Sequence, residues 1–175
     1  MDSFKEQIVK KNPTTKDRTL KSLIMTVGIF LAVVIVLFSF MYMPMVAAFS
    51  IFIAAALVYG AFFLAQRFDV EYEYIFTNGE MDVDKIIAQR SRKRLVTVKM
   101  NTATAFGVAD ENYTVDTDKT LVLANSNFAD DTDYYIEFSH KSLGASSIVF
   151  TPDEDMLELI KPSLPRQLKK EIEKY

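Results

Sequence analysis

The longest apolar stretch of the chain covers residues 22–65 and contains no Asp, Glu, Lys, Arg or His. One membrane-spanning helix needs roughly 20 apolar residues, so the stretch is long enough for two. Pro44 lies at its midpoint and breaks a helix, because proline lacks an N–H donor and clashes with the preceding turn. We therefore predict a transmembrane helical hairpin over 22–67, with helices at 20–42 and 46–67.

Lysine and arginine flank this stretch on both sides, whereas the turn around Pro44 carries no charge. Lys and Arg accumulate in cytoplasmic loops, which predicts a multi-pass cell-membrane protein with both termini in the cytoplasm. A cleaved signal peptide is disfavoured because the first apolar segment is too long and a second follows at once. A kinked helix lying half in the interface is also disfavoured, because neither half has a polar face.

Small residues recur four positions apart in the second predicted helix. Such spacing lets two helices approach closely within lipid. The helix-packing candidates are Ser50, Ala54, Ala56 and Gly60. Packing on the first helix and contact with a second copy of the chain are both consistent with this pattern.

Beyond Asp69 the pattern changes to short segments rich in β-branched and aromatic residues, separated by polar turns. Asn78-Gly79 is a strong signal for a two-residue hairpin. Strands are predicted at 70–77, 80–86, 94–100, 105–108, 120–124, 134–138 and 147–151. Thr151-Pro152-Asp153-Glu154 then provides a cap, a proline and first-turn acids for a helix that ends before Pro162.

Seven strands followed by one helix is the element order of a pleckstrin-homology (PH)-like domain. With the apolar hairpin, the strand at 72–79 and the basic-then-apolar run at 90–98, the chain resembles small uncharacterised bacterial membrane proteins that carry two N-terminal transmembrane helices and a bacterial PH-like domain. The resemblance implies an α+β membrane protein whose hairpin precedes a PH-like antiparallel seven-stranded β-barrel or sandwich with a C-terminal helix. The expected segments are an N-terminal cytoplasmic segment (1–21), the hairpin (22–67), the PH-like domain (69–161) and a charged tail or helix (162–175).

A basic run follows the second predicted strand. Clustered Lys and Arg near a bilayer attract anionic headgroups, by about 1 kcal/mol for each residue. The candidate lipid-binding residues are Arg90, Arg92, Lys93 and Arg94. PH domains often bind phosphoinositides with a basic first hairpin, but the tight Asn78-Gly79 turn is too short to enclose a headgroup. The basic run therefore has two interpretations. It makes loose contact with membrane lipids, or it is a solvated strand end that only sets the membrane topology.

Other chemistry has little support in the sequence. The chain has no cysteine, which excludes disulfides and cysteine metal sites, and a net charge of −3 does not favour nucleic-acid binding. Three methionines at the apolar turn lack an accompanying His or Cys, and His140 is the only histidine. The acidic loops at 110–118 and 130–133 lack the spacing of a calcium loop. We expect no catalytic residue, no metal and no cofactor.

These observations predict a membrane-anchored, non-enzymatic interaction module. Its PH-like domain would bind a protein, a peptide or a lipid headgroup at the cytoplasmic face, for example by strand addition at a sheet edge. The alternative is an accessory or oligomeric component of a membrane transport system, in which the helices are the functional part.

Overall fold

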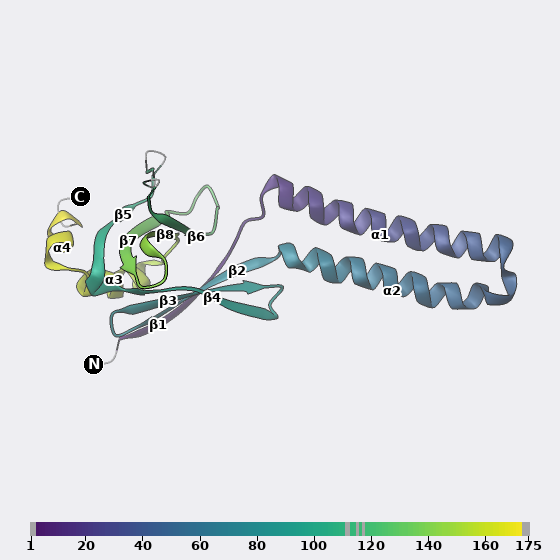
Figure 1. Ribbon diagram of the computed structural model, residues 1–175, viewed down its shortest axis with the longest axis horizontal. Helices are drawn as coiled ribbons and strands as arrows, with labels where there is room; N and C mark the ends of the chain where they lie inside the picture. Colours follow the sequence, from purple (N-terminus) through teal and green to yellow (C-terminus); the bar gives the residue numbers. More distant parts are fainter. Residues whose placement is uncertain (1–2, 111–112, 115, 117, 173–175) are drawn as a thin grey trace. The chain divides into compact units, whose positions relative to one another are not determined.

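The computed structural model describes residues 3–110, 113, 114, 116 and 118–172 (Figure 1). The chain forms two compact units. One comprises residues 13–70, and the other combines residues 1–12 with residues 71–175. The first unit is a helical hairpin that ends at Val70, and the second contains the strands of the described residues, so the N-terminal residues belong with the β-rich unit.

The helical unit consists of α1 (Thr15–Tyr42) and α2 (Ala47–Ala65), each followed by a 3-10 turn, η1 (Pro44–Val46) and η2 (Gln66–Phe68). Both helices are long and apolar enough to cross a membrane. The predicted break at Pro44 is confirmed. Helix α1 begins five residues before the predicted start, because Thr14 and Asp17 form a reciprocal capping box at its N-terminus.

Small residues form the contact between the two helices. The buried positions are Gly28, Ala32 and Ser39 of α1 and Ala47, Ser50, Ala61 and Ala65 of α2. A Cβ atom added at Gly28 would lie only 2.4 Å from the Cβ of Ala61, so the helices touch directly at this level. At the open end of the hairpin, Lys21 Nζ lies 2.6 Å from a carboxylate oxygen of Asp69.

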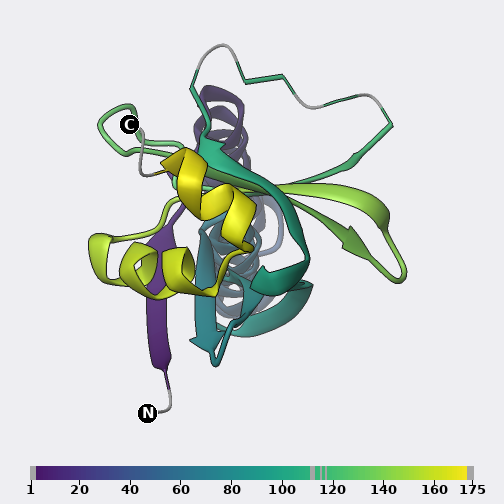
Figure 2. The ribbon, with the colours of Figure 1, turned by 90° about the vertical axis from the view of Figure 1, so that its left-hand side faces the viewer.

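The β-rich unit contains two four-stranded sheets (Figures 1 and 2). The first has the order β1-β2-β3-β4, formed by Phe4–Lys10, Val70–Thr77, Glu80–Ile87 and Ser91–Lys99. The second has the order β5-β7-β8-β6, formed by Ala103–Val108, Tyr134–His140, Gly144–Phe150 and Thr120–Ala124. The 3-10 turn η3 (Met100–Thr102) joins the sheets, and α3 (Glu154–Ser163) and α4 (Arg166–Ile172) follow them.

Strand β1 corrects the prediction of seven strands. Residues 4–10 pair antiparallel with β2, from Phe4 opposite Thr77 to Lys10 opposite Glu71. The helical hairpin is therefore inserted between two neighbouring strands of one sheet. The connection between the first two strands is thus the hairpin itself, and the tight Asn78-Gly79 turn joins the second and third strands.

The second sheet also departs from the antiparallel prediction. Strand β6 runs parallel to β8, with Thr120 opposite Ser146 and Ala124 opposite Phe150, whereas β7 pairs antiparallel with both β5 and β8. The chain reaches β6 by a long connection from β5 instead of by a hairpin. The parallel neighbours β6 and β8 are connected through β7, and no local turn signal reveals such a crossover.

Local signals predicted the turns and caps with mixed accuracy. The turn at Asn78-Gly79 is confirmed, with positive φ angles of 48° and 87° at its two residues. The cap of α3 is Asp153, not Thr151, because the Asp153 side chain accepts a hydrogen bond from Met156 N. Pro162 lies within the last turn of α3, so it does not end the helix where predicted.

Tyr74 of β2 joins the two sheets in the core. Its ring is fully buried and meets the ring of Phe150 edge-to-face at 5.7 Å. Its hydroxyl donates to the carbonyl oxygen of Ala124 and accepts from Thr151 N at 3.2 Å. One side chain of the first sheet therefore satisfies backbone groups at the ends of β6 and β8.

Removing the Tyr74 hydroxyl should destabilise the β-rich unit without changing its fold. In Tyr74→Phe, the amide of Thr151 and the carbonyl of Ala124 lose this partner in a buried setting, which costs about 1–3 kcal/mol. Denaturant unfolding of the detergent-solubilised chain measures the loss. A matched Tyr134→Phe variant, at a partly exposed tyrosine of β7, should change the unfolding free energy by much less.

Candidate functional site

The basic run that sequence reasoning selected lies mostly within β4, which begins at Ser91 instead of at Arg94. Successive strand residues point to opposite faces, so the run is divided between the two sides of the sheet. Arg92 and Arg94 share one face, which we call the outer face of the first sheet. Lys93 lies on the other, opposite Lys85 of β3.

The arginines on the outer face form ion pairs with acidic residues of the neighbouring strands. Arg92 Nη2 lies 2.8 Å from Glu73 Oε1, and Arg94 Nη1 lies 2.6 Å from Asp82 Oδ2. Arg94 also pairs with Asp84, whose side chain is only 5% exposed. Asp82 further accepts a hydrogen bond from Thr97 at 2.6 Å. Two of the four candidate lipid-binding residues are therefore engaged in a charged network of the protein itself.

Lys85 and Lys93 have different surroundings. They are cross-strand neighbours, and neither forms an ion pair with any residue that the structure describes. Like charges placed directly opposite each other in a sheet are unfavourable, so the pair favours an anionic partner. Arg90 lies in the nearby turn between β3 and β4. Gln89 of that turn bonds Glu71 at 3.2 Å, which places the turn at the sheet end where β2 begins.

Glu73 is the most unusual member of the outer face. Its side chain is only 1% exposed, and its Oε2 atom has no hydrogen-bond partner among the residues that the structure describes. Burial raises the pKa of this carboxyl, the Arg92 guanidinium opposes the shift, and nearby Glu6 of β1 adds to it. The register places Ile8 directly opposite Glu73 and Glu6 opposite Ile75, so residues of β1 flank this carboxyl.

Glu73→Gln should remove a pH dependence of stability. Because the folded-state pKa of Glu73 lies above 4.5, its protonation stabilises the fold fully below that pH, and this contribution disappears as pH rises through the folded-state value. The neutral glutamine has no such loss. The variant should therefore gain stability relative to the wild-type chain between acidic and neutral pH, measured by denaturant unfolding over that range. A difference that stays constant with pH would contradict the assignment.

The helix-packing candidates also separate into two groups. Ser50 is buried against α1, and its hydroxyl bonds the carbonyl of Ala47 at 2.6 Å. Ala54 is half-buried, Ala56 is exposed, and a Cβ atom at Gly60 would meet nothing within 4 Å. Besides Ser50, the interhelical contact uses Ala61 and Ala65, which share the same four-residue spacing.

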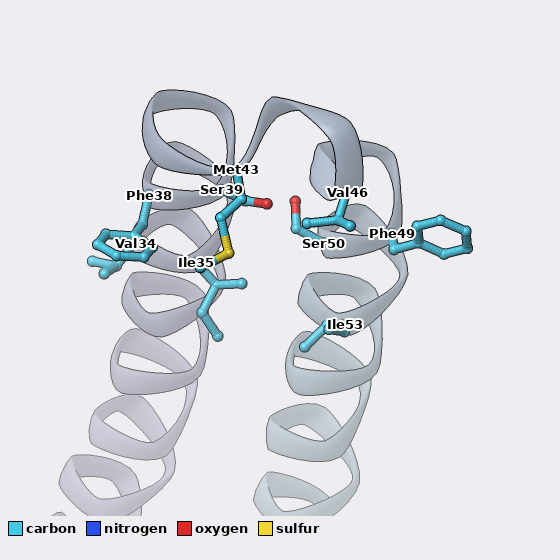
Figure 3. Close-up of a pocket in the computed structure, with 9 residues that line it drawn as sticks. All are labelled: Val34, Ile35, Phe38, Ser39, Met43, Val46, Phe49, Ser50 and Ile53. Atoms are coloured by element: carbon cyan, nitrogen blue, oxygen red, sulfur yellow. The ribbon is translucent and has the colours of Figure 1, made fainter.

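A cavity of about 350 Å³ lies between the helices near the turn (Figure 3). Its walls are apolar apart from two hydroxyls, those of Ser39 and Ser50, which face each other across the gap in Figure 3. Phe38 and Phe49 lie at the two sides of the cavity. The helices therefore touch closely at Gly28 and leave space towards Pro44.

The family of the chain follows from its sequence pattern as a whole. A family model described as "Bacterial PH-like domain (DUF6106)" matches residues 1–170. The chain belongs to this bacterial PH-like family. The match includes β1, both helices and both sheets, so the inserted hairpin is part of the family pattern. No curated protein and no solved structure matched the chain.

The remaining sequence candidates lie apart from the outer face of this PH-like domain. His140 ends β7, and its Nδ1 contacts the amide and hydroxyl of Ser142 at 3.3 and 3.1 Å. Met41, Met43 and Met45 are exposed around the helical turn. Within the described residues, no group of three or more His, Cys, Asp or Glu side chains is arranged to hold a metal ion. Part of the acidic loop at 110–118 lies outside the described residues.

Sequence reasoning missed Glu73, Asp82 and Asp84 as partners of the arginines. A signal for them was present, because acids at alternate positions of β2 and β3 face arginines at alternate positions of β4. That signal becomes readable only when the strand register is known.

Proposed function

We propose that the chain is a membrane-anchored, non-enzymatic interaction module whose PH-like domain is held at the cytoplasmic face by the helical hairpin. One observation carries the proposal: the hairpin is inserted between β1 and β2. Neighbouring strands lie about 4.8 Å apart, so the chain leaves and re-enters the sheet at almost the same point. A spanning hairpin attached in this way returns its two ends to one side of the membrane.

Flanking charge favours the cytoplasm as that side. Lys10, Lys11, Lys16, Arg18 and Lys21 precede or begin the first helix, and Arg67 follows the second. The η1 turn between the helices carries no charge. This asymmetry is typical of a hairpin whose turn has crossed the membrane.

The absence of cysteine makes this topology straightforward to test. Single cysteines at Met45 in the turn and at Ser142 in the β7–β8 turn can be labelled in intact cells with a membrane-impermeant maleimide. Both positions are exposed, so access depends on the side of the membrane. We expect label at position 45 in intact cells and at position 142 only after permeabilisation. Label at both positions in intact cells, or at neither, would disprove the proposed topology.

Lipid contact by the domain is proposed for Lys85, Lys93 and Arg90. This region lies at the end of the sheet from which β2 continues back into the hairpin. In nanodiscs that contain anionic lipid, Lys85→Gln combined with Lys93→Gln should increase deuterium exchange in the β3–β4 turn. The same comparison in nanodiscs of zwitterionic lipid provides the control, because no anionic headgroup is then present for the lysines to contact. Equal exchange in the double variant and the wild-type chain would remove lipid binding from the proposal.

A second candidate function rests on the helices. The cavity beside Ser39 and Ser50 and the open surface at Gly60 fit an accessory component of a transport system that packs against another membrane helix. Gly60→Leu would block such packing while leaving the contact at Gly28 intact. If this variant abolishes function and replacement of the sheet residues does not, the helices are the functional part.

A further inference from the structure

The two sheets have four edge strands, β1, β4, β5 and β6, and three of them are protected. An unprotected edge offers unpaired backbone groups to another chain. Strand β4 carries Arg92, Lys93 and Arg94 and a bulge in its pairing with β3. Strand β5 has an irregularity near Ala103 and lies against α4.

The edge of β1 is joined to the second sheet at both ends. Asn12 N donates to the carbonyl of Ser126 at 2.6 Å, just beyond the end of the strand. Gln7 donates to the carbonyl of Thr151 at 3.1 Å and accepts from Asp153 N at 3.0 Å. A cavity of about 300 Å³ beside these bonds is lined by residues of β1 and by Ser126, Thr151 and Asp153, so this edge of β1 already faces other segments of the same chain.

Strand β6 has none of these protections among the described residues. Its sequence is Thr-Leu-Val-Leu-Ala, without a charge, a proline or a bulge. It pairs with β8 along one edge only. Leu121 and Leu123 are 43% and 56% exposed, and their alternate spacing places them on one face of the sheet. An added strand would cover both side chains and pair with the free backbone edge.

The charges at the ends of β6 indicate the chemistry of such a partner. Asp116 and Asp118 precede the strand, and Asp130 and Asp131 follow it in the next turn. Asp118, Asp130 and Asp131 form no ion pair with any described residue, whereas Lys119 is held by Glu137 at 2.8 Å. Lys141 lies in the turn that Thr120 contacts through the carbonyl of Leu143, and Lys10 lines a cavity together with Asp131, so each end of β6 has two aspartates and one nearby lysine without an ion pair to a described residue.

The same charges argue against a second copy of this chain as the partner. If β6 paired with β6 of another copy in antiparallel orientation, the acids before one strand would face the acids after the other. In parallel orientation, equivalent aspartates would lie next to each other. Like charges across a strand pair are unfavourable, so the edge favours a different, basic chain.

We propose that the free edge of β6 binds an extended segment of a partner protein, in which alternating apolar residues are flanked by lysine or arginine. This inference rests on the proposed function and specifies the partner of the interaction module. Backbone hydrogen bonds to β6 would supply the pairing, and Leu121 and Leu123 would select apolar residues at alternate positions. The acidic ends would select the flanking cations.

The test uses the full chain in nanodiscs of zwitterionic lipid, so that a basic probe is not attracted to the bilayer. The probe is a fluorescent peptide with two valines alternating with threonines and with two lysines at each end. We expect saturable binding by fluorescence anisotropy that weakens with added salt. A peptide with glutamates in place of the lysines, and one N-methylated at alternate amides, should bind at least about tenfold more weakly.

Leu123→Lys is the decisive variant, and Val108→Lys is its matched control. Val108 is similarly exposed, at 49%, but lies on β5 at the opposite edge of the same sheet. Leu123→Lys should weaken peptide binding at least about tenfold, and Val108→Lys should leave it unchanged. Unfolding curves confirm that both variants are folded.

Three results would overturn the proposal. They are no binding by the wild-type chain at millimolar peptide, equal binding by wild type and Leu123→Lys, and a wild-type dimer in light scattering that Leu123→Lys abolishes. The cysteine-labelling experiment tests the membrane-anchored module separately, so failure of the β6 edge is distinguishable from failure of the anchored topology.

Discussion

Replacing Phe4–Lys10 with a flexible Gly-Ser segment of equal length is expected to unfold much of the β-rich unit. The substitution removes one of the two strands that pair with β2, along seven residue pairs. It also removes buried Val9, the Gln7 bonds to Thr151 and Asp153, and the ion pairs of Lys5 with Asp153 and Asp155. Domains of this size are stable by only about 5–15 kcal/mol, so losing a whole strand consumes much of that margin.

Hydrogen exchange and limited proteolysis of the chain in detergent measure this effect. Amides of β2 should lose protection, and the region from Asp153 to the start of α3 should become sensitive to protease. Helix α1 should still form, because its capping residues, Thr14 and Asp17, remain. Unchanged protection of β2 would show that β1 adds nothing to the sheet.

Two neighbouring point variants provide the control for the strand replacement. Val9 is 9% exposed and lies on the core face, whereas Ile8 is 54% exposed on the outer face. Val9→Ser should destabilise the unit by about 1–3 kcal/mol, and Ile8→Ser should have a small effect. The reverse order would mean that the register of β1 against β2 is shifted by one residue.

Gly28→Ala is expected to force the two helices apart. The new methyl group would lie 2.4 Å from the Cβ of Ala61, far closer than two carbon atoms can approach. Helix backbones carry both atoms, so no side-chain rotation relieves the clash. Overpacking of this kind costs about 1–3 kcal/mol. Unfolding of the hairpin in SDS titrations, followed by circular dichroism, measures the loss.

The second helix offers both a rescue and a control for this prediction. Ala61→Gly combined with Gly28→Ala exchanges the two residues across the contact and should restore most of the lost stability. Gly60→Ala introduces the same methyl group where nothing lies within 4 Å, and alanine is the better helix former, so it should be neutral or slightly stabilising. If the exchange does not rescue Gly28→Ala, the helices do not pack through this pair.

The elements with local signals could be predicted from the sequence. The apolar run with Pro44 predicted both helices, and Asn78-Gly79 predicted the hairpin of β2 and β3. Strand β1 could not be found in the same way, because its partner is separated from it by the whole helical hairpin. A short strand that contains Lys5, Glu6 and Lys10 has little apolar periodicity of its own.

The candidate site could be predicted only in part, because the pairing of its strands is not visible in the sequence. The basic run is visible as a cluster in the sequence, but a strand turns alternate residues to opposite faces. Arg92 and Arg94 therefore meet acids of β2 and β3, and Lys93 meets Lys85. The edge character of β6 depends on its parallel pairing with β8, for which the sequence contains no turn signal.

The insertion of the hairpin between β1 and β2 also constrains the order in which the elements fold during synthesis. Strand β1 is synthesised first, yet its partner emerges from the ribosome only after both helices. Without the helices, closing such a long loop would carry a large entropic cost and slow the pairing. Formation of the hairpin brings Lys21 and Asp69 together, so the chain that remains to be closed between β1 and β2 is much shorter. Formation of the helical hairpin is thus expected to precede the pairing of β1 with β2, because it shortens the loop between them.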